Sequence, residues 1–340
     1  MYEVDFFAVG DGERSGDAIA LRYTIPGRAE PIVGVIDAGF LSNGEELVEH
    51  IPKYYGTDRV DFVLSTHPDG DHINGTGAVV RGLDVQCLLI HRPAKHGYSS
   101  NSGSKPAEEL AKLVEGKGGS VVEPFAGMSG FDGSFMIAGP TEDFYEQMLA
   151  EQVTILKESR QISLAQRFAG TSVIKAARQF LAKFPTERDF DDAGGDNPRN
   201  NSSAILSLMI DERHLLFFGD AGVPAIKGAL DHLDGERRTA TWPRLIVLPH
   251  HGSRHNLDLE TIKRMLGDPA GVKFGSAIAS VSAESDNPSP RVANAVGRRG
   301  YPVAVTAGET FRHSWDAPPR PGWNCEVTVL GPLSETDHGD

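Results

Sequence analysis

The stretch LSTHPDGDHING, residues 64–75, gathers metal-binding types of side chain into one short turn. The residues concerned are His67, Asp69, Asp71 and His72. Two carboxylates and two imidazoles held together repel one another or compete for protons unless a cation lies between them. Ligands at alternate positions of an extended segment (67, 69 and 71) would also point the same way. The stretch therefore predicts a site for divalent metal ions.

Two later strand-like segments end in the same kinds of side chain. The run LLFFG is followed by Asp220, and LIVLP is followed by His250 and His251. Imidazole and carboxylate groups are the usual ligands of divalent transition metals. Strand ends are also where a rigid scaffold presents side chains to a cleft. We expect these three residues to converge on the turn at 64–75.

The order of strands and helices predicts the fold class. Residues 2–140 and 203–331 contain short apolar runs bounded by Gly, Pro or Asp, which are typical of strands, with helices expected near 44–54, 74–81 and 105–116. Residues 141–184 carry apolar side chains at helical spacing and predict two helices, broken near Gly170, before a polar loop. We therefore expect a mixed α/β fold of two packed sheets with helices outside, as one domain over residues 1–340 with a helical insertion at 141–199.

Composition and charge narrow the functional classes. The chain has 340 residues, 39% of them hydrophobic, and a net charge of −14. This acidity argues against a broad electrostatic grip on nucleic acid, which needs clustered Lys and Arg. No apolar run is long enough to cross a membrane, and two cysteines make no disulfide framework, so a cytoplasmic location without membrane contact is expected.

Taken in order, the motifs resemble those of the metallo-β-lactamase superfamily. THPDGDH is similar to its His-x-His-x-Asp-His signature, with Asp69 at the second His. This Asp form resembles the hydrolase domain of the ComEC/Rec2 competence proteins, as do NNSSAILSL (200–208), LLFFGDA (215–221) and LPHHGS (248–253). The resemblance covers most of the chain outside 141–199. It implies a four-layer αβ/βα sandwich with metal ions at one edge, between the sheets.

The resemblance also implies which residues hold the metal ions. The expected ligands are His67 and Asp69 in a first site, Asp71 and His72 in a second site, and Asp220 between the two ions. The last ligand comes from PHH, where His251 is favoured over His250. One or two divalent ions per chain are expected, with Zn or Mn first and Fe or Mg as alternatives.

One departure from the wider superfamily affects the first site. Most members supply another His ahead of the bridging Asp, and this chain has NNSS there. Asn200, Asn201, Ser202 or Ser203 must then stand in, with Asn201 as the candidate metal ligand and Asn200 and Ser202 as substrate candidates. Amide and hydroxyl oxygens are weaker ligands than imidazole, which predicts a first site that is weak or that is filled only when substrate is present.

The implied activity is hydrolysis by a metal-activated water, with a phosphodiester as the favoured substrate, either a small molecule or single-stranded nucleic acid. Asp71 would orient the water, and His250 would protonate the leaving group or hold a phosphate oxygen. Ser253 and the amide of Gly252 are candidates for that second role. Asp37, in VIDAG, is expected to brace the site from behind its ligands.

Other readings stay open. His91 and His96 follow a strand end and are candidates for substrate contact, whereas His313 is expected in a late loop. Hydrolysis of a carbonyl ester, lactone or β-lactam uses the same chemistry. A non-catalytic, metal-stabilised module whose insertion recruits a protein partner is a third possibility. The helices at 141–184 are expected to form an added packing layer, with a lid over the cleft or a surface for a second copy of the chain as alternatives.

Overall fold

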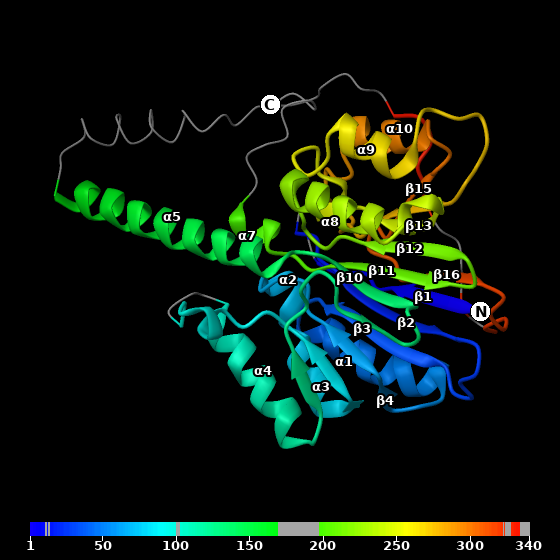
Figure 1. The fold of residues 1–340 in the computed structure, drawn as a ribbon, viewed down its shortest axis with the longest axis horizontal. Helices are drawn as coiled ribbons and strands as arrows, with labels where there is room; N and C mark the ends of the chain where they lie inside the picture. Colours follow the sequence, from blue (N-terminus) through cyan, green and yellow to red (C-terminus); the bar gives the residue numbers. More distant parts are fainter. Residues whose placement is uncertain are drawn as a thin grey trace.

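Two β-sheets lie face to face at the centre of the molecule, and helices cover their outer faces (Figure 1). The structure is a computed structural model. It describes residues 1–340 except 11, 13, 100–102, 169–196, 322, 324–327 and 334–340, with side chains of the long helix α5 described up to residue 156. The layers run helix, sheet, sheet, helix. This confirms the four-layer αβ/βα sandwich expected from the sequence.

The first sheet comes mainly from the N-terminal half. Its order is β16-β1-β2-β3-β5-β7-β8. These strands are β1 (Tyr2–Phe6), β2 (Ala18–Tyr23), β3 (Ile32–Ala38), β5 (Phe62–Leu64), β7 (Cys87–Leu89), β8 (Ser120–Val122) and β16 (Phe311–Trp315). A separate two-stranded pair joins β4 (Arg59–Val60) to β6 (Asp84–Val85).

The second sheet has the order β17-β15-β14-β13-β12-β11-β10-β9. Its strands are β9 (Ser129–Gly130), β10 (Phe135–Gly139), β11 (Ile205–Ile210), β12 (Arg213–Phe217), β13 (Pro243–Val247), β14 (Ser276–Ala279), β15 (Val303–Val305) and β17 (Thr328–Val329). Strand β10 precedes the helical insertion and β11 follows it, and the two pair antiparallel. The insertion therefore leaves and re-enters this sheet between neighbouring strands.

The helices form the two outer layers. Those beside the first sheet are α1 (Leu41–His50), continued by a π-turn (Ile51–Tyr55), α2 (Gly70–Ile73), α3 (Thr76–Gly82) and α4 (Ser104–Gly116). Those beside the second are α8 (Val223–Gly235), α9 (Leu259–Leu266) and α10 (Pro290–Gly297). The short α7 (Pro198–Asn201) and the 3-10 turn η5 (Pro249–Gly252) lie in connections. None of the described helices is long and apolar enough to span a membrane.

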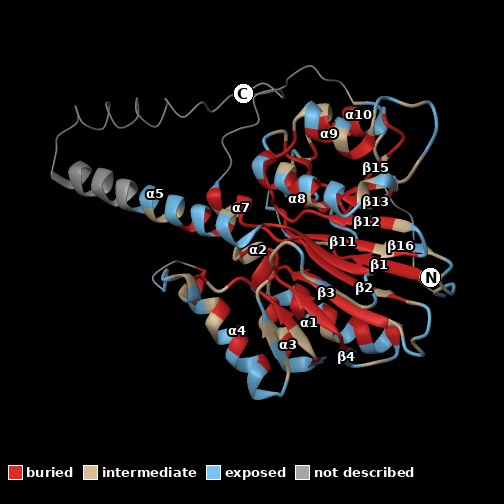
Figure 2. Ribbon diagram, in the orientation of Figure 1, coloured by how far each residue is buried: buried red, intermediate tan, exposed pale blue. Residues whose placement is uncertain are grey.

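Burial explains the layering. Most residues in the central strands of both sheets are buried (Figure 2), and three clusters of apolar side chains cover the faces of the sheets. Phe6 and Phe62 of the first sheet and Phe217 of the second belong to one buried cluster between the sheets. A second cluster joins the outer face of the second sheet to α8, α9 and α10, and a third joins the first sheet to α1, α3 and α4. Strands buried on both faces are near-continuous apolar runs, which made them visible in the sequence.

Two elements differ from expectation or extend it. His313 lies in strand β16, not in a loop, because FRHSW pairs antiparallel with β1 and places Phe311 opposite Phe6. Arg312 in this strand pairs with the buried Glu3, so its charge concealed a core strand from sequence patterning. The first helix of the insertion is confirmed as α5 (Glu142–Phe168), which extends away from the sandwich in Figure 1. The expected break near Gly170, the second helix and most of the polar loop lie outside the described residues.

Candidate metal centre

The candidate ligands gather where parallel strands of both sheets end. Strand β3 is parallel to β5, and β12 is parallel to β13, so their carboxyl ends lie at shared edges. Asp37 closes β3, the turn at 64–75 follows β5, Asp220 follows β12, and the tandem histidines follow β13. The convergence predicted from the strand ends is therefore present.

The local backbone of the turn differs from the extended segment we predicted. Asp69 stands at the N-cap of α2, and Asp71 and His72 lie inside that helix. The directions of these side chains are therefore not set by the alternation of residues along a strand. The one-turn helix instead presents Asp71 and His72 from successive helical positions.

Close approaches and strained residues hold the turns together. Gly219 has φ +52°, and a Cβ atom there would lie 2.9 Å from the Thr66 side chain, so only glycine lets the Asp220 turn lie against the 64–75 turn. Asp37, His250 and His251 also have positive φ, at 51°, 46° and 58°. Residues kept in this costly region cluster at functional sites, because the surrounding structure must impose the conformation.

One buried carboxylate fixes the tautomers of two histidines. Asp37 Oδ2 accepts hydrogen bonds from His72 Nδ1 at 2.8 Å and from Thr66 Oγ1 at 2.6 Å. The Thr66 hydroxyl gives its only hydrogen to Asp37, so it accepts one from His67 Nδ1 at 3.0 Å. Both imidazoles therefore carry the hydrogen on Nδ1 and present Nε2 to the site, as expected for the bracing role of Asp37.

A buried amide does the same for His250. Asn256 Nδ2 donates to the backbone carbonyls of Asp220 and Ala221, at 3.0 and 3.3 Å. Its Oδ1 is thereby turned to His250 Nδ1 at 3.0 Å and accepts the hydrogen there. Asn200 Nδ2 lies 3.2 Å from the same Nδ1, but Asn256 is closer and its amide orientation is fixed by two carbonyls, so Nε2 of His250 is left as an acceptor, like those of His67 and His72.

All three Nε2 atoms face the carboxylate of Asp220. His72 Nε2 lies 3.4 Å from Oδ1, whereas His67 and His250 lie 3.5 and 3.7 Å from Oδ2. Donor atoms at these separations suit a shared ion, because bonds of about 2.0–2.2 Å at tetrahedral angles place neighbouring ligands about 3.4 Å apart. Nε2 of His67 and His72 and Oδ1 of Asp220 are buried without a hydrogen-bond partner in the described chain. A cation is the missing component, so the residues fit a metal ion.

The second site is the more compact of the two. Asp71, His72 and His251 place one ligand atom each within 4.8 Å of one another, and the rings of His72 and His251 stack with centroids 5.7 Å apart. His251 is buried, whereas the His250 side chain is 37% exposed. The geometry favours His251 as the ligand and His250 as the imidazole at the rim.

Asp17 belongs to the site and was not singled out from the sequence. It precedes β2, whose first residue pairs with Ala38 at the end of β3, so this start of a strand lies beside Asp37. Its Oδ2 is 3.9 Å from His72 Nδ1, and its Oδ1 has no hydrogen-bond partner in the described part of the chain. The antiparallel register of β2 and β3 is the signal that would have identified it.

Arg199 was also missed, and it changes the surroundings of Asp69. Its Nε lies 2.5 Å from Asp69 Oδ1, and Nη2 donates to the carbonyl of Pro68 at 2.9 Å. The other oxygen of Asp69 lies 3.9 Å from His67 Nε2. Asp69 therefore reaches the first site while it is paired with a guanidinium. The only signal in the sequence was that Arg199 directly precedes NNSS, residues 200–203.

The residues of NNSS, expected from the sequence to stand in for a histidine, make separate contacts. Asn200 Nδ2 lies 3.2 Å from His250 Nδ1, Ser202 Oγ donates to the Arg199 carbonyl, and Ser203 Oγ accepts from the backbone N–H of Asp220 at 3.2 Å. Asn201 Oδ1 is buried and lacks a hydrogen-bond partner among the described residues. The ligand role of Asn201 and the substrate roles of Asn200 and Ser202 stay predictions.

The electrostatics of the cluster also indicate a missing cation. Burial raises the pKa of Asp17 to about 7 and also raises the pKa of Asp220. Burial and the neighbouring His72 hold the pKa of His67 well below its usual value. For His72, burial is outweighed by the charges of Asp220 and Asp37, which raise its pKa well above the usual value. These opposing shifts arise because acids and imidazoles are buried in contact with one another, which a cation between them would relieve.

Two other candidates lie apart from this cluster. His96 contacts Glu123 and Glu146, at 3.2 and 2.9 Å, in a separate group that includes Glu142. The Ser253 hydroxyl accepts from the backbone N–H of His255 at 3.3 Å, which is a contact within its own turn. A substrate role for His96 and a catalytic role for Ser253 stay predictions.

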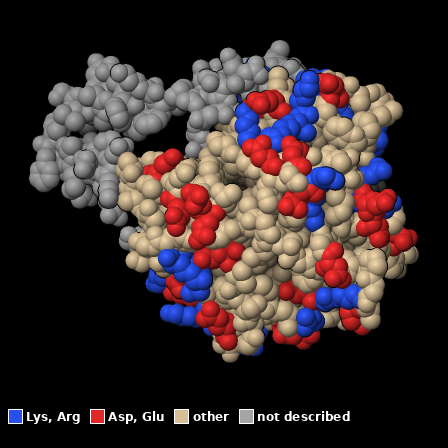
Figure 3. All heavy atoms as spheres, in the orientation of Figure 1, with Lys and Arg blue, Asp and Glu red and all other residues tan. Residues whose placement is uncertain are grey.

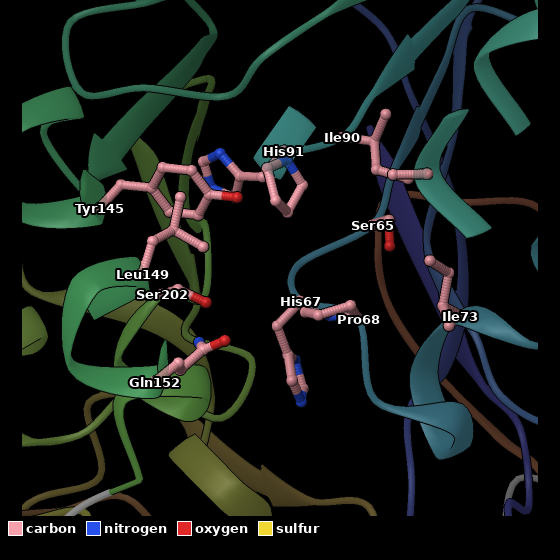
Figure 4. A pocket seen from close by; sticks show the side chains of 12 residues that line it. Ser65, His67, Pro68, Ile73, Ile90, His91, Tyr145, Leu149, Gln152 and Ser202 are labelled. Atoms are coloured by element: carbon pink, nitrogen blue, oxygen red, sulfur yellow. The ribbon is translucent and has the colours of Figure 1, made fainter. Parts of the chain in front are cut away.

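His91 lies in a small cavity that reaches the metal centre (Figure 4). The cavity has a volume of about 20 Å³ and is lined by His67, His91 and, from α5, Tyr145. The rings of His91 and Tyr145 stack with centroids 4.3 Å apart. Both ring nitrogens of His91 are buried with no hydrogen-bond partner in the described chain, and burial lowers the pKa of His91 to about 3. The volume suits about one ordered water.

Comparisons with known proteins give only weak similarities. No family model and no curated protein matches the chain. Among solved structures, a proposed metallo-β-lactamase of Thermotoga maritima matches with a TM-score of 0.36 and 14% identity, over 73% of this chain and 96% of that one. A metallo-β-lactamase of Cronobacter sakazakii matches at 0.35 and 11% (71% and 76%), and a superfamily protein of Sulfolobus tokodaii at 0.30 and 12% (72% and 77%). Similarities this weak do not assign the chain to a family.

Replacing Asp37 tests the anchoring of the histidines. In Asp37→Asn, the acceptor shared by Thr66 and His72 loses its charge, so we expect divalent metal ions to bind about 10–100-fold more weakly. Isothermal titration calorimetry of chelator-stripped protein measures the change. Asp258→Asn is the matched control, because Asp258 caps α9 and asparagine caps equally well. Unchanged metal affinity in Asp37→Asn would show that Asp37 does not orient His67 and His72 for metal binding.

Replacing His91 tests the buried imidazole. Because its pKa is about 3 in the folded state and near 6.5 when unfolded, the unfolded chain binds the extra proton between these values. His91 therefore lowers the free energy of unfolding as the pH falls from 6.5 towards 3, by at most about 1.4 kcal/mol per pH unit. We expect His91→Phe to flatten the pH dependence in this range, measured by urea unfolding without metal. Parallel curves for both proteins would show that His91 is charged or solvated in the fold.

Proposed function

We propose that this protein is a metal-dependent hydrolase, with phosphodiesters as its favoured substrates. The supporting observation is the convergence of three Nε2 atoms on Asp220, where Nε2 of His67 and His72 and Oδ1 of Asp220 are buried without a hydrogen-bond partner in the described chain. A bound divalent ion would supply a Lewis acid and a water acidified towards a pKa of about 7. Asp71, His72, His251 and Asp220 would hold one ion through Oδ1 of Asp220, and His67 and His250 face the other oxygen of that carboxylate, Oδ2.

The chain's own residues divide the remaining work. Asp71 lies beside His72 and His251 and is placed to orient a water through its carboxylate. His250 is partly exposed, and its Nδ1 hydrogen is held by Asn256, so Nε2 is the atom that exchanges a proton with substrate. Its Nε2 lone pair would first accept a proton from the attacking water and then return it to the leaving group, a role that suits a ring anchored at Nδ1 and partly exposed.

Two features favour a phosphodiester over a carbonyl substrate. Arg199 places a guanidinium beside the centre, and this planar group suits phosphate oxygens. The donor set is also richer in oxygen than a histidine-based centre, because Asp69 and NNSS take positions that imidazoles occupy in most of the superfamily resembled. Hydrolysis of a carbonyl ester, lactone or β-lactam remains the second candidate, since the same activated water attacks a carbonyl.

The surface charge favours a small phosphodiester over a long nucleic acid. On the face shown in Figure 3, Lys and Arg form small groups beside Asp and Glu, with no continuous basic band. Strand-binding grooves instead combine a basic track with aromatic platforms. The net charge of −14 agrees with this choice.

Substrate competition tests the proposal. We expect protein loaded with Mn²⁺ or Zn²⁺ to hydrolyse bis(p-nitrophenyl) phosphate, and Asp71→Ala to lower kcat at least about 100-fold. Asp268→Ala is the control, because this carboxylate is 73% exposed and pairs with Lys263. Single-stranded DNA, RNA, nitrocefin and a lactone are assayed in parallel. Faster turnover of nitrocefin or the lactone would reverse the order of substrates, and full activity in Asp71→Ala would exclude catalysis at this centre.

A further inference from the structure

The two sides of the centre are not equally prepared for an ion. On the side of the second site, Asp71, His72 and His251 form one compact group. A second compact group consists of Asp17, His72 and Asp220. Among the described residues, no group with all its ligand atoms within 4.8 Å of one another contains Asp69 or His250. The donors of the first side are therefore more widely spaced.

Arg199 accounts for this difference. Asp69 turns Oδ1 to the guanidinium, 2.5 Å from Nε, and leaves Oδ2 at 3.9 Å from His67 Nε2. The pair is half-buried, with side chains 30% and 29% exposed, and Arg199 is further held by the Pro68 carbonyl. The guanidinium carries a positive charge, so it repels a dication placed beside it and neutralises the carboxylate that the dication would otherwise attract.

The other first-side donors do not compensate. Nδ1 of His250 is held by Asn256 and its ring lies at the rim, while Asp220 is shared with the second side. Among the described residues, His67 is then the one fully buried imidazole whose Nε2 faces the first side, because His250, whose Nε2 faces the same Asp220 oxygen, is 37% exposed and is assigned to proton exchange with substrate in the proposed function. A single imidazole and a shared carboxylate form an incomplete set for an ion that takes four or more ligands.

We infer that the centre holds one tightly bound divalent ion, at Asp71, His72, His251 and Asp220, and that Arg199 takes the place of a second ion. This inference rests on the proposed function in one respect, namely that the guanidinium then meets the substrate's phosphate oxygen from the first side. The metal count itself does not depend on the substrate. The pairing of Arg199 with Asp69 is then a further reason why the first site binds metal weakly.

Metal titration of Arg199 variants tests this assignment. Chelator-stripped protein is titrated with Mn²⁺, by calorimetry for stoichiometry and by electron paramagnetic resonance for coupling between ions. The variants are Arg199→Gln, which removes the charge, and Arg199→Lys, which keeps it. Arg28→Gln is the matched control, because Arg28 is 31% exposed and pairs with a buried aspartate, Asp61, at 2.7 Å.

We expect the wild type, Arg199→Lys and Arg28→Gln to bind one Mn²⁺ tightly, with the spectrum of an isolated ion. In Arg199→Gln, Asp69 becomes available, and a second ion should bind at least about 10-fold more tightly than in the wild type and give a spin-coupled pair through Asp220. Two tight, coupled ions in the wild type would overturn the inference, even if Arg199→Gln failed to fold. An unchanged second-ion affinity in folded Arg199→Gln would also overturn it. Because no step uses a substrate, failure of the proposed hydrolysis leaves these readouts intact.

Discussion

The hydrogen bonds around Asp37 are the constraint on which the centre depends. This carboxylate is buried at the end of β3, accepts from His72 directly and orders His67 through the Thr66 hydroxyl. Asn256 does the same for His250 from the opposite sheet. Each imidazole is thereby turned so that a lone pair, not a hydrogen, faces Asp220. Acceptors surrounding a carboxylate are unfavourable in a folded protein unless a cation joins them.

The fold supplies this arrangement by bringing two strand edges together. The first sheet contributes Asp37 and the turn with His67, and the second contributes Asp220 and the tandem histidines. The apolar cluster between the sheets, with Phe62 and Phe217 among its members, sets the relative position of the two edges. Core packing far from the chemistry consequently fixes distances that metal binding requires to a few tenths of an ångström.

Much of this could be predicted from the sequence, because the relevant signals are local. Apolar runs bounded by turn residues located most strands, and clustered His and Asp located the turn at 64–75. What escaped prediction depends on the fold: Asp17 reaches the site through an antiparallel register, and Arg199 through a contact with Asp69. The geometry of α2 was mistaken because a one-turn helix leaves no periodicity to detect. Strand β16 was concealed by Arg312, whose charge is neutralised by Glu3 inside the fold.

We expect a divalent ion to complete the acceptors around Asp220. Crystals grown with Mn²⁺ or Zn²⁺, and an anomalous difference map at the metal edge, test it most directly. We expect an anomalous peak about 2.0–2.2 Å from Nε2 of His72 and from a carboxylate oxygen of Asp220. A map with no peak there, or with its only peak at the separate group of His96, Glu142 and Glu146, would contradict it.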